Sequence, residues 1–326
     1  MKLKSGSFLF GVGCGSIKLP PTMNLPNTFI IHDEVQTALN ERRPVLALES
    51  TIISHGMPYP DNLDFAQLAE HECREYGATP ATIAILDGRV HIGLNEGALE
   101  KLARGDGIEK VATRDLGLII ARCKSGATTV SATMRLAYLA GIQVFATGGI
   151  GGVHRGAEQT GDISLDLKEL GETPVIVISA GAKAILDLPR TLEYLETAGV
   201  PVLGYQTDEF PAFYSRKSGL SVAWRVDSPE EIAAIFREQL TLSLTVGLLV
   251  TNPVPLQFEI PATELNPIIE KALYECEQLG IRGKAVTPYL LGKIVELTAG
   301  RSLATNIQLA LNNIRLGAAV ALALTR

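Results

Sequence analysis

Residues 141–183 constrain the fold of this chain more than any other segment, because two apolar runs flank a glycine-rich turn. The first run, 141–146, predicts a buried strand and is followed by TGGIGG at 147–152. Four glycines in six residues allow a tight backbone whose N–H groups can face an anion. The second run, 175–179, predicts another strand and leads to Lys183. Ligands bind at the carboxyl ends of strands in open α/β sheets, so the segment predicts an α/β fold with a binding site beside this lysine.

Each of these features also has an ordinary structural explanation. The turn contains neither the P-loop pattern nor a clean dinucleotide-binding fingerprint. A lysine after a strand is most often a surface lysine. Asp162 and Asp166, four residues apart, are compatible with solvated acids in the first turn of a helix. The residues alone leave both explanations open, but the presence of a glycine loop, carboxylates and a lysine in one segment favours a site for an anionic ligand.

The composition favours a protein that acts on small metabolites. The 326 residues are 46% hydrophobic, which is enough for a large core, and a net charge of −6 gives no electrostatic footprint for nucleic acid or an anionic membrane. The four cysteines are widely spaced, which argues against a zinc site or a disulfide framework and predicts a reducing, cytoplasmic setting. No apolar stretch reaches the roughly 18 residues of a membrane span. We therefore expect a soluble protein without nucleic-acid or membrane partners.

The pattern along the chain predicts one domain. Residues 81–86 and 89–94, joined by an Asp-Gly turn, predict an antiparallel hairpin within an otherwise alternating order of strands and helices. The C-terminal part has helical spacing throughout. The predicted fold class is a three-layer α/β/α single domain with a mainly parallel central sheet, an antiparallel hairpin and a helical C-terminal region. This domain spans 25–326, and 1–24 are predicted to be a disordered N-terminal extension.

Three further segments carry candidate functional residues. The apolar run 44–48 ends at Glu49, and an acid there is costly unless it is paired, faces a cleft or takes part in chemistry. The hydroxyl-rich stretch 126–130 predicts the opening of a helix, where threonines suit capping or a ligand phosphate. The loop 206–216 combines acids, three aromatics and an arginine. It is either an exposed loop pinned by its aromatics or a wall or lid of a pocket.

Nine strings in the sequence combine these features with unusual density. They are ALESTIISHGMPYP, ATIAILDGR, GATTVSATM, FATGGIGGVHRGAE, DISLDL, SAGAKAILDL, GYQTDEFPAFYSR, TNPVP and SLATNI. Together they resemble the pseudouridine-5′-phosphate glycosidase family, and ALEST with GGIGGVHRG is highly specific to it. The resemblance extends from residue 25 to the C-terminus.

The resemblance implies an enzyme that reversibly cleaves pseudouridine 5′-phosphate with water to uracil and ribose 5-phosphate. The bond broken joins two carbons, C5 of the base and C1′ of the sugar, so a pair of carboxylates that expels an oxygen or nitrogen leaving group is not sufficient. An amine can provide the missing electron sink. The resemblance assigns this amine to Lys183, as nucleophile at C1′. It assigns the proton delivered to the ring oxygen to Glu49, whose pKa we expect burial to raise.

The same resemblance implies the rest of the site. It assigns one Mn²⁺ ion per subunit to Asp162, a hard oxygen ligand whose coordination shell water would complete. The implied substrate contacts are Ser164, Leu165 and Asp166 beside the metal, His154 and Asn306 at the 5′-phosphate, and Lys110, Thr129 and Val130 at the base and the sugar. The family also implies a homotrimer.

Two other functions fit the residues. A class I aldolase-like lyase acting on a phosphosugar would use the same strand-borne lysine and phosphate loop, but it would need no metal and would not act on a nucleoside phosphate. A non-catalytic phosphosugar-binding protein would keep its binding when Lys183 is lost. The sequence contains no DNA-binding module that would support a regulator of this kind.

Overall fold

The computed structural model describes residues 25–326, apart from the side chain of Lys284. The predicted extension at 1–24 lies outside the described residues. The strands are β1 (Phe29–Ile31), β2 (Val45–Leu48), β3 (Thr79–Leu86), β4 (Arg89–Ile92), β5 (Ile108–Val111), β6 (Ser125–Thr128), β7 (Val144–Ala146), β8 (Val153–His154), β9 (Ile176–Ser179), β10 (Leu186–Asp187), β11 (Val202–Tyr205), β12 (Trp224–Val226) and β13 (Leu248–Thr251). The central sheet has the order β1-β4-β3-β2-β7-β9-β13-β11-β12, with β6 beside β3 and β5 beside β6. A second, two-stranded sheet joins β8 and β10.

Helices alternate with the strands and then dominate the C-terminal part. They are α1 (Asp33–Asn40), α2 (Thr51–Gly56), α3 (Asp61–Glu75), α4 (Glu96–Arg104), α5 (Leu116–Ala121), α6 (Val130–Leu139), α7 (Ala157–Thr160), α8 (Leu165–Leu170), α9 (Leu188–Thr197), α10 (Pro229–Thr241), α11 (Ala262–Gln278), α12 (Val286–Leu297) and α13 (Arg301–Thr325), with 3₁₀ turns η1 (Thr113–Asp115), η2 (Leu256–Phe258) and η3 (Gly283–Ala285). Polar caps fix several starts: the Ser228 hydroxyl, for example, accepts from the Glu231 N–H at the first turn of α10.

The predicted fold class is confirmed. Every neighbouring pair from β3 through β2, β7, β9, β13 and β11 to β12 is parallel. β3 and β4 form the predicted antiparallel hairpin. All residues of β2, β9 and β13 are buried, as expected for parallel strands that helices cover on both faces.

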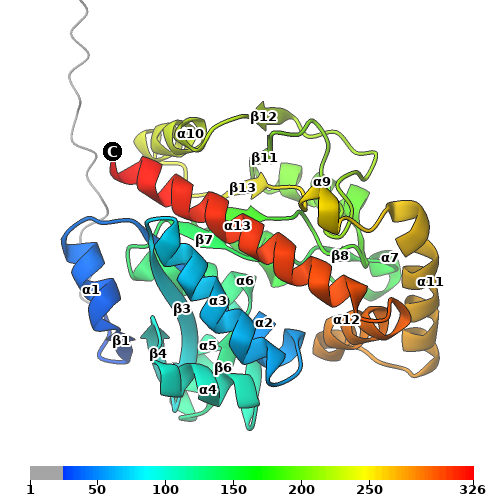
Figure 1. Cartoon of the computed structure of the whole chain (residues 1–326), viewed down its shortest axis with the longest axis horizontal. Coiled ribbons are helices and arrows are strands. Elements are labelled where there is room, and N and C mark those ends of the chain that lie inside the picture. Colours follow the sequence, from blue (N-terminus) through cyan, green and yellow to red (C-terminus); the bar gives the residue numbers. More distant parts are fainter. Residues whose placement is uncertain (1–24) are drawn as a thin grey trace, which may run out of the picture.

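The helices form two outer layers around the sheet. α13 runs diagonally across one face beside α3 and contacts β2, β7 and β9, whereas α6, backed by α8, covers the other face (Figure 1). Within the described part of the chain, α13 is the one helix with the length and apolar composition of a membrane span, but 61% of that stretch is buried. It is therefore placed as the core helix of the domain.

Some boundaries differ from the sequence prediction. The stretch predicted only to open a helix first forms strand β6, and α6 follows from Val130. The apolar pattern of 244–250 predicts a buried strand over its whole length, but β13 begins only at Leu248, and Leu244 itself is 46% exposed. In the loop 206–216 the three aromatic side chains are fully buried, so this loop is pinned to the core.

Candidate active site

Three neighbouring parallel strands deliver the acid, the glycine loop and the lysine to one edge of the sheet. The register aligns Leu48 of β2 with Ala146 of β7, and Ala146 with Ile178 of β9. Glu49 and the TGGIGG loop therefore leave the sheet at the same level, and Lys183 follows just beyond the end of β9. Because the carboxyl ends of these strands lie side by side, groups distant in sequence meet at one place.

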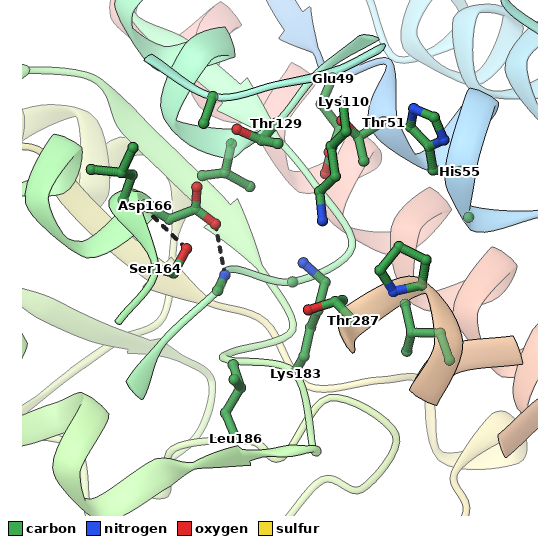
Figure 2. Close-up of a pocket in the computed structure, with 18 of the residues that line it drawn as sticks. Glu49, Thr51, His55, Lys110, Thr129, Ser164, Asp166, Lys183, Leu186 and Thr287 are labelled. Atoms are coloured by element: carbon green, nitrogen blue, oxygen red, sulfur yellow. Dashed lines mark hydrogen bonds between the residues drawn. The ribbon is translucent and has the colours of Figure 1, made fainter. Parts of the chain in front are cut away.

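A pocket of about 280 Å³ lies at this edge and brings all eleven predicted site residues together. They are Glu49, Lys110, Thr129, Val130, His154, Asp162, Ser164, Leu165, Asp166, Lys183 and Asn306. Figure 2 shows the amino groups of Lys110 and Lys183 directed toward the same space, with Glu49 beside Lys110. The pocket thus combines an acid, amines and hydroxyls from six or more separate segments, which is the arrangement of an active site rather than of a structural cluster.

The Glu49 carboxyl is held at the base of the pocket. Thr147 donates its hydroxyl hydrogen bond to it. Burial raises the pKa of Glu49 above its ordinary value, and the nearby Lys183 and the Thr147 hydrogen bond oppose this effect in part. The direction agrees with the sequence-based expectation, and it favours a carboxyl that carries a proton to deliver.

The backbone of the glycine loop is joined to the segment that carries Lys183. The Ile150 N–H donates to the Gly181 carbonyl at 3.1 Å, and the Lys183 N–H donates back to the Ile150 carbonyl at 3.1 Å. Phe213, from the loop 206–216 (the aromatic loop), packs directly against the glycine loop. A Cβ on Gly149 would lie 2.5 Å from the Phe213 ring. Phe213 also lines the pocket, so the aromatic loop is both pinned and a wall of the site.

The carboxylate of Asp166 links the glycine loop to the start of α6 by hydrogen bonds. One carboxylate oxygen accepts from the Gly151 N–H at 2.8 Å and the other from the Ser131 N–H at 2.9 Å (Figure 2 shows the first of these). Its N–H donates to the Ser164 hydroxyl at 3.2 Å. A Cβ on Gly151 would lie 2.3 Å from the Ser164 Oγ, so a glycine is required there for this approach. Asp166 is 6% exposed, which rules out the explanation that it is a solvated helix acid.

His154 and Asp162 lie together at another part of the pocket. The backbone N–H of His154 donates to the backbone carbonyl of Asp162 at 3.0 Å. Burial lowers the pKa of His154, and the Asp162 carboxylate only partly opposes this, so the imidazole is favoured in its neutral form. Within residues 25–326 no three His, Cys, Asp or Glu side chains gather into a metal-binding group. Asp162 fits a hard divalent ion only as a single protein carboxylate, with water and ligand oxygens as the other donors.

Asn306 reaches the pocket from α13. The residue is 7% exposed, and its buried Oδ1 makes no hydrogen bond within the described chain. An unpaired buried acceptor is costly unless a ligand supplies an N–H or O–H donor. At the phosphate assigned to this residue by resemblance, only the amide NH₂ group would suit an unprotonated oxygen.

Several pocket residues were missed from the sequence. Thr51 and His55 lie one helical turn apart on α2, directly after Glu49, and a scan for polar residues at this spacing behind the strand would have found them. Burial lowers the pKa of His55, and its Nε2 has no partner within the described residues. Thr287 and Leu291 come from α12. The helical pattern of this segment does not indicate that α12 packs beside the active-site edge of the sheet.

Fold and pocket define an α/β enzyme that works at the carboxyl ends of a mainly parallel sheet. The family described as "Indigoidine synthase A like protein" matches residues 34–323. Pseudouridine-5′-phosphate glycosidases of Jannaschia sp. and Caldanaerobacter subterraneus are 59% and 56% identical over 93% and 92% of this chain, and 100% and 98% of their own. The solved prealnumycin C-glycosynthase AlnA in complex with ribulose 5-phosphate has a TM-score of 0.85 and 40% identity, covering 92% of this chain and 98% of its own. The chain belongs to the pseudouridine-5′-phosphate glycosidase family.

Proposed function

We propose that this protein reversibly converts pseudouridine 5′-phosphate and water to uracil and ribose 5-phosphate. The observation that carries the proposal is the alignment of three neighbouring strand ends, which brings Glu49, the glycine loop and Lys183 to one pocket. The names of two close relatives support the substrate, and the C-glycosynthase with its pentulose phosphate supports a carbon–carbon glycosidic reaction on this fold.

The phosphate end of the substrate is assigned to the glycine loop and His154. Since burial favours the neutral imidazole, His154 contributes a hydrogen bond there rather than a charge. Asp162 would hold a divalent ion, Mn²⁺ by resemblance, and the ion would supply positive charge to the anionic substrate. Asn306 belongs to the same phosphate end, Ser164, Leu165 and Asp166 lie beside the ion, and Lys110, Thr129 and Val130 contact the base and the sugar, as the resemblance implies.

Lys183 acts first, as the nucleophile. Its amine forms a bond to C1′ while the bond between C1′ and the ring oxygen breaks. Glu49 gives its proton to that oxygen, so the ribose opens without an unprotonated alkoxide. The raised pKa of Glu49 favours the protonated form that this step needs.

The second step breaks the carbon–carbon bond. The adduct nitrogen first gives one proton to the Glu49 carboxylate that the first step left behind. Its lone pair then forms a C1′=N double bond while the C1′–C5 bond breaks and C5 of the base takes up that proton. Uracil leaves, and an iminium remains on Lys183. Water adds to C1′ and releases ribose 5-phosphate with the free amine, and the proton set free returns to the Glu49 carboxylate. Substrate and water together thus balance the two products.

Borohydride trapping tests this proposal. The protein is incubated with ribose 5-phosphate and borohydride, with and without uracil and Mn²⁺, and its intact mass is measured. We expect a reduced pentose phosphate adduct on the wild type and none on Lys183→Ala. The matched control is Lys168→Ala, which removes an exposed lysine on α8 and is expected to keep the adduct. Uracil with Mn²⁺ should yield pseudouridine 5′-phosphate, and chelation of the metal should abolish that product.

Two outcomes would contradict the proposal in different ways. An adduct that forms without any effect of metal or uracil, and no nucleotide product, would indicate the aldolase-like lyase. The absence of any adduct on the wild type would overturn the lysine mechanism.

We also propose a cytoplasmic homotrimer, as the resemblance implies, and light scattering of the purified protein measures its subunit number.

A further inference from the structure

Two buried asparagines outside the pocket join strand ends beneath the active site. Asn313 on α13 and Asn252, which follows β13, are 0% and 5% exposed, and neither lines the pocket. Nδ2 of Asn252 donates to Oδ1 of Asn313 at 3.1 Å. A pair of amides in an apolar layer is costly unless its polar atoms are bonded, so the partners of these atoms define its role.

Asn313 binds the first two residues of the glycine loop. Its Nδ2 donates to the carbonyl oxygen of Thr147 at 2.8 Å and to that of Gly148 at 3.3 Å. The Thr147 N–H donates to the Ile178 carbonyl at 3.0 Å. The backbone N–H and C=O of Thr147 are therefore both hydrogen-bonded. This holds the residue in place, and with it the hydroxyl that donates to Glu49.

Asn252 extends the contact toward the strand that precedes Lys183. Its N–H donates to the Ser179 carbonyl at the end of β9, at 2.8 Å. The next residue along, Ala180, donates its N–H to the same Gly148 carbonyl that Asn313 holds, at 2.9 Å. The asparagine pair thus lies where the ends of β7, β9 and β13 meet.

We propose that the Asn252–Asn313 pair positions the active site, by fixing Thr147 so that Glu49 stays aligned with Lys183. This inference rests on the proposed function, in which these two residues are acid and nucleophile. The asparagines contact no substrate and act only through the backbone that they bind, as a supporting shell does. Both amide NH₂ groups and the Asn313 Oδ1 are hydrogen-bonded. A buried amide network of this kind is rigid, because each bond is strong in a low-dielectric surrounding.

Asn313→Ala removes both donors to the loop and tests the inference. We expect kcat to fall about tenfold to a hundredfold, because a small misplacement of a reacting group has such an effect. KM should change less than kcat, since no pocket-lining side chain changes. The Thr147 hydrogen bond holds down the pKa of Glu49, so its loss should also move the alkaline limb of the kcat profile to higher pH. A purely structural role would not move this limb.

Two further variants separate positioning from stability. Asn312→Ala is the matched control, because this neighbouring side chain on α13 donates to the Pro253 carbonyl at 3.3 Å and not to the loop. We expect it to keep the wild-type kcat and alkaline limb. Asn313→Asp preserves shape but directs carboxylate oxygens at two carbonyls, and we expect it to lose at least as much kcat as the alanine variant. Melting temperatures of all variants identify any loss of folded protein.

The inference and the proposed function fail in distinguishable ways. If Asn313→Ala melts earlier but keeps the wild-type kcat and alkaline limb, the pair is only structural and the inference is wrong. If the wild type itself forms no pseudouridine 5′-phosphate, the proposed function is wrong. In that case the rate of the ribose 5-phosphate adduct on Lys183 decides: Asn313→Ala should slow it and Asn312→Ala should not, and equal rates overturn the inference.

Discussion

The pKa of the Glu49 carboxyl group is set by opposing effects within the pocket. Removal from water raises its pKa, whereas the charge of Lys183 and the Thr147 hydroxyl lower it, and burial is the largest of the three. A proton donor needs the protonated form at the pH of the reaction. In the proposed reaction, kcat should therefore decline as the pH rises above the pKa of Glu49.

Glu49→Gln removes this donor while keeping the shape of the side chain. We expect kcat to fall by about 10²–10⁴, the usual contribution of a positioned general acid. The alkaline limb should vanish from the residual activity, because glutamine does not titrate. Steady-state kinetics of both proteins between pH 5 and 10, the range that brackets the expected limb, measures this. An unchanged limb in the variant would show that another group controls the pH dependence.

Residues at strand ends could be predicted from the sequence, whereas residues on distant helices could not. Glu49 and Lys183 each follow an apolar run, and the strand-end rule indicates a site there without any resemblance. Asn306 was assigned by resemblance alone. Asn313 gave no signal, because a polar residue within a helical pattern does not reveal that it is fully buried against a loop 166 positions away.

The loop after β9 depends on a glycine that no other residue can replace without strain. Gly181 has φ +86°, and a Cβ there would lie 2.2 Å from the Pro211 carbonyl oxygen. Gly199, after α9, has φ +71°, and a Cβ added there would have no other part of the described chain within 4 Å. Alanine at 199 should cost about 1–2 kcal/mol through backbone strain alone. Alanine at 181 adds the collision, and we expect a total of about 2–5 kcal/mol. Urea unfolding of both variants compares them, and equal losses would contradict the expected collision.

Elements with strong patterns were predicted well, and those built from small residues were not. The hairpin, the buried strands on either side of the glycine loop and the C-terminal helices are confirmed. Strand β6 was missed because its residues, Ser-Gly-Ala-Thr, carry almost no β-branched signal. The structure explains this composition: a Cβ on Gly126 would lie 2.3 Å from Cγ2 of Val111 on the paired strand β5. Close packing between strands here excludes the side chains that would identify a strand.

The raised pKa that suits Glu49 to proton donation should make the folded protein less stable at alkaline pH. The folded carboxyl holds its proton to higher pH than the unfolded one, whose pKa is 4.5, so its contribution to stability is fully present below pH 4.5 and is lost as pH rises through the folded pKa. Glu49→Gln carries no charge and should melt higher than the wild type at pH 8, by about 2–4 °C for a gain near 1 kcal/mol. Calorimetry at pH 8 and near pH 4.5 tests the sign. A variant that melts lower than the wild type at pH 8 would contradict it.

The long helix α13 supplies the last support to groups that are encoded far earlier in the chain. Asn313 holds the loop beside Glu49, and Gly317 lets the helix lie close enough to β2 that an added Cβ would meet Leu46 at 2.8 Å. During synthesis, acid and amine emerge from the ribosome well before this helix. A nascent chain without it would have the chemical groups but not their alignment, so the protein should gain its activity only when translation has passed α13.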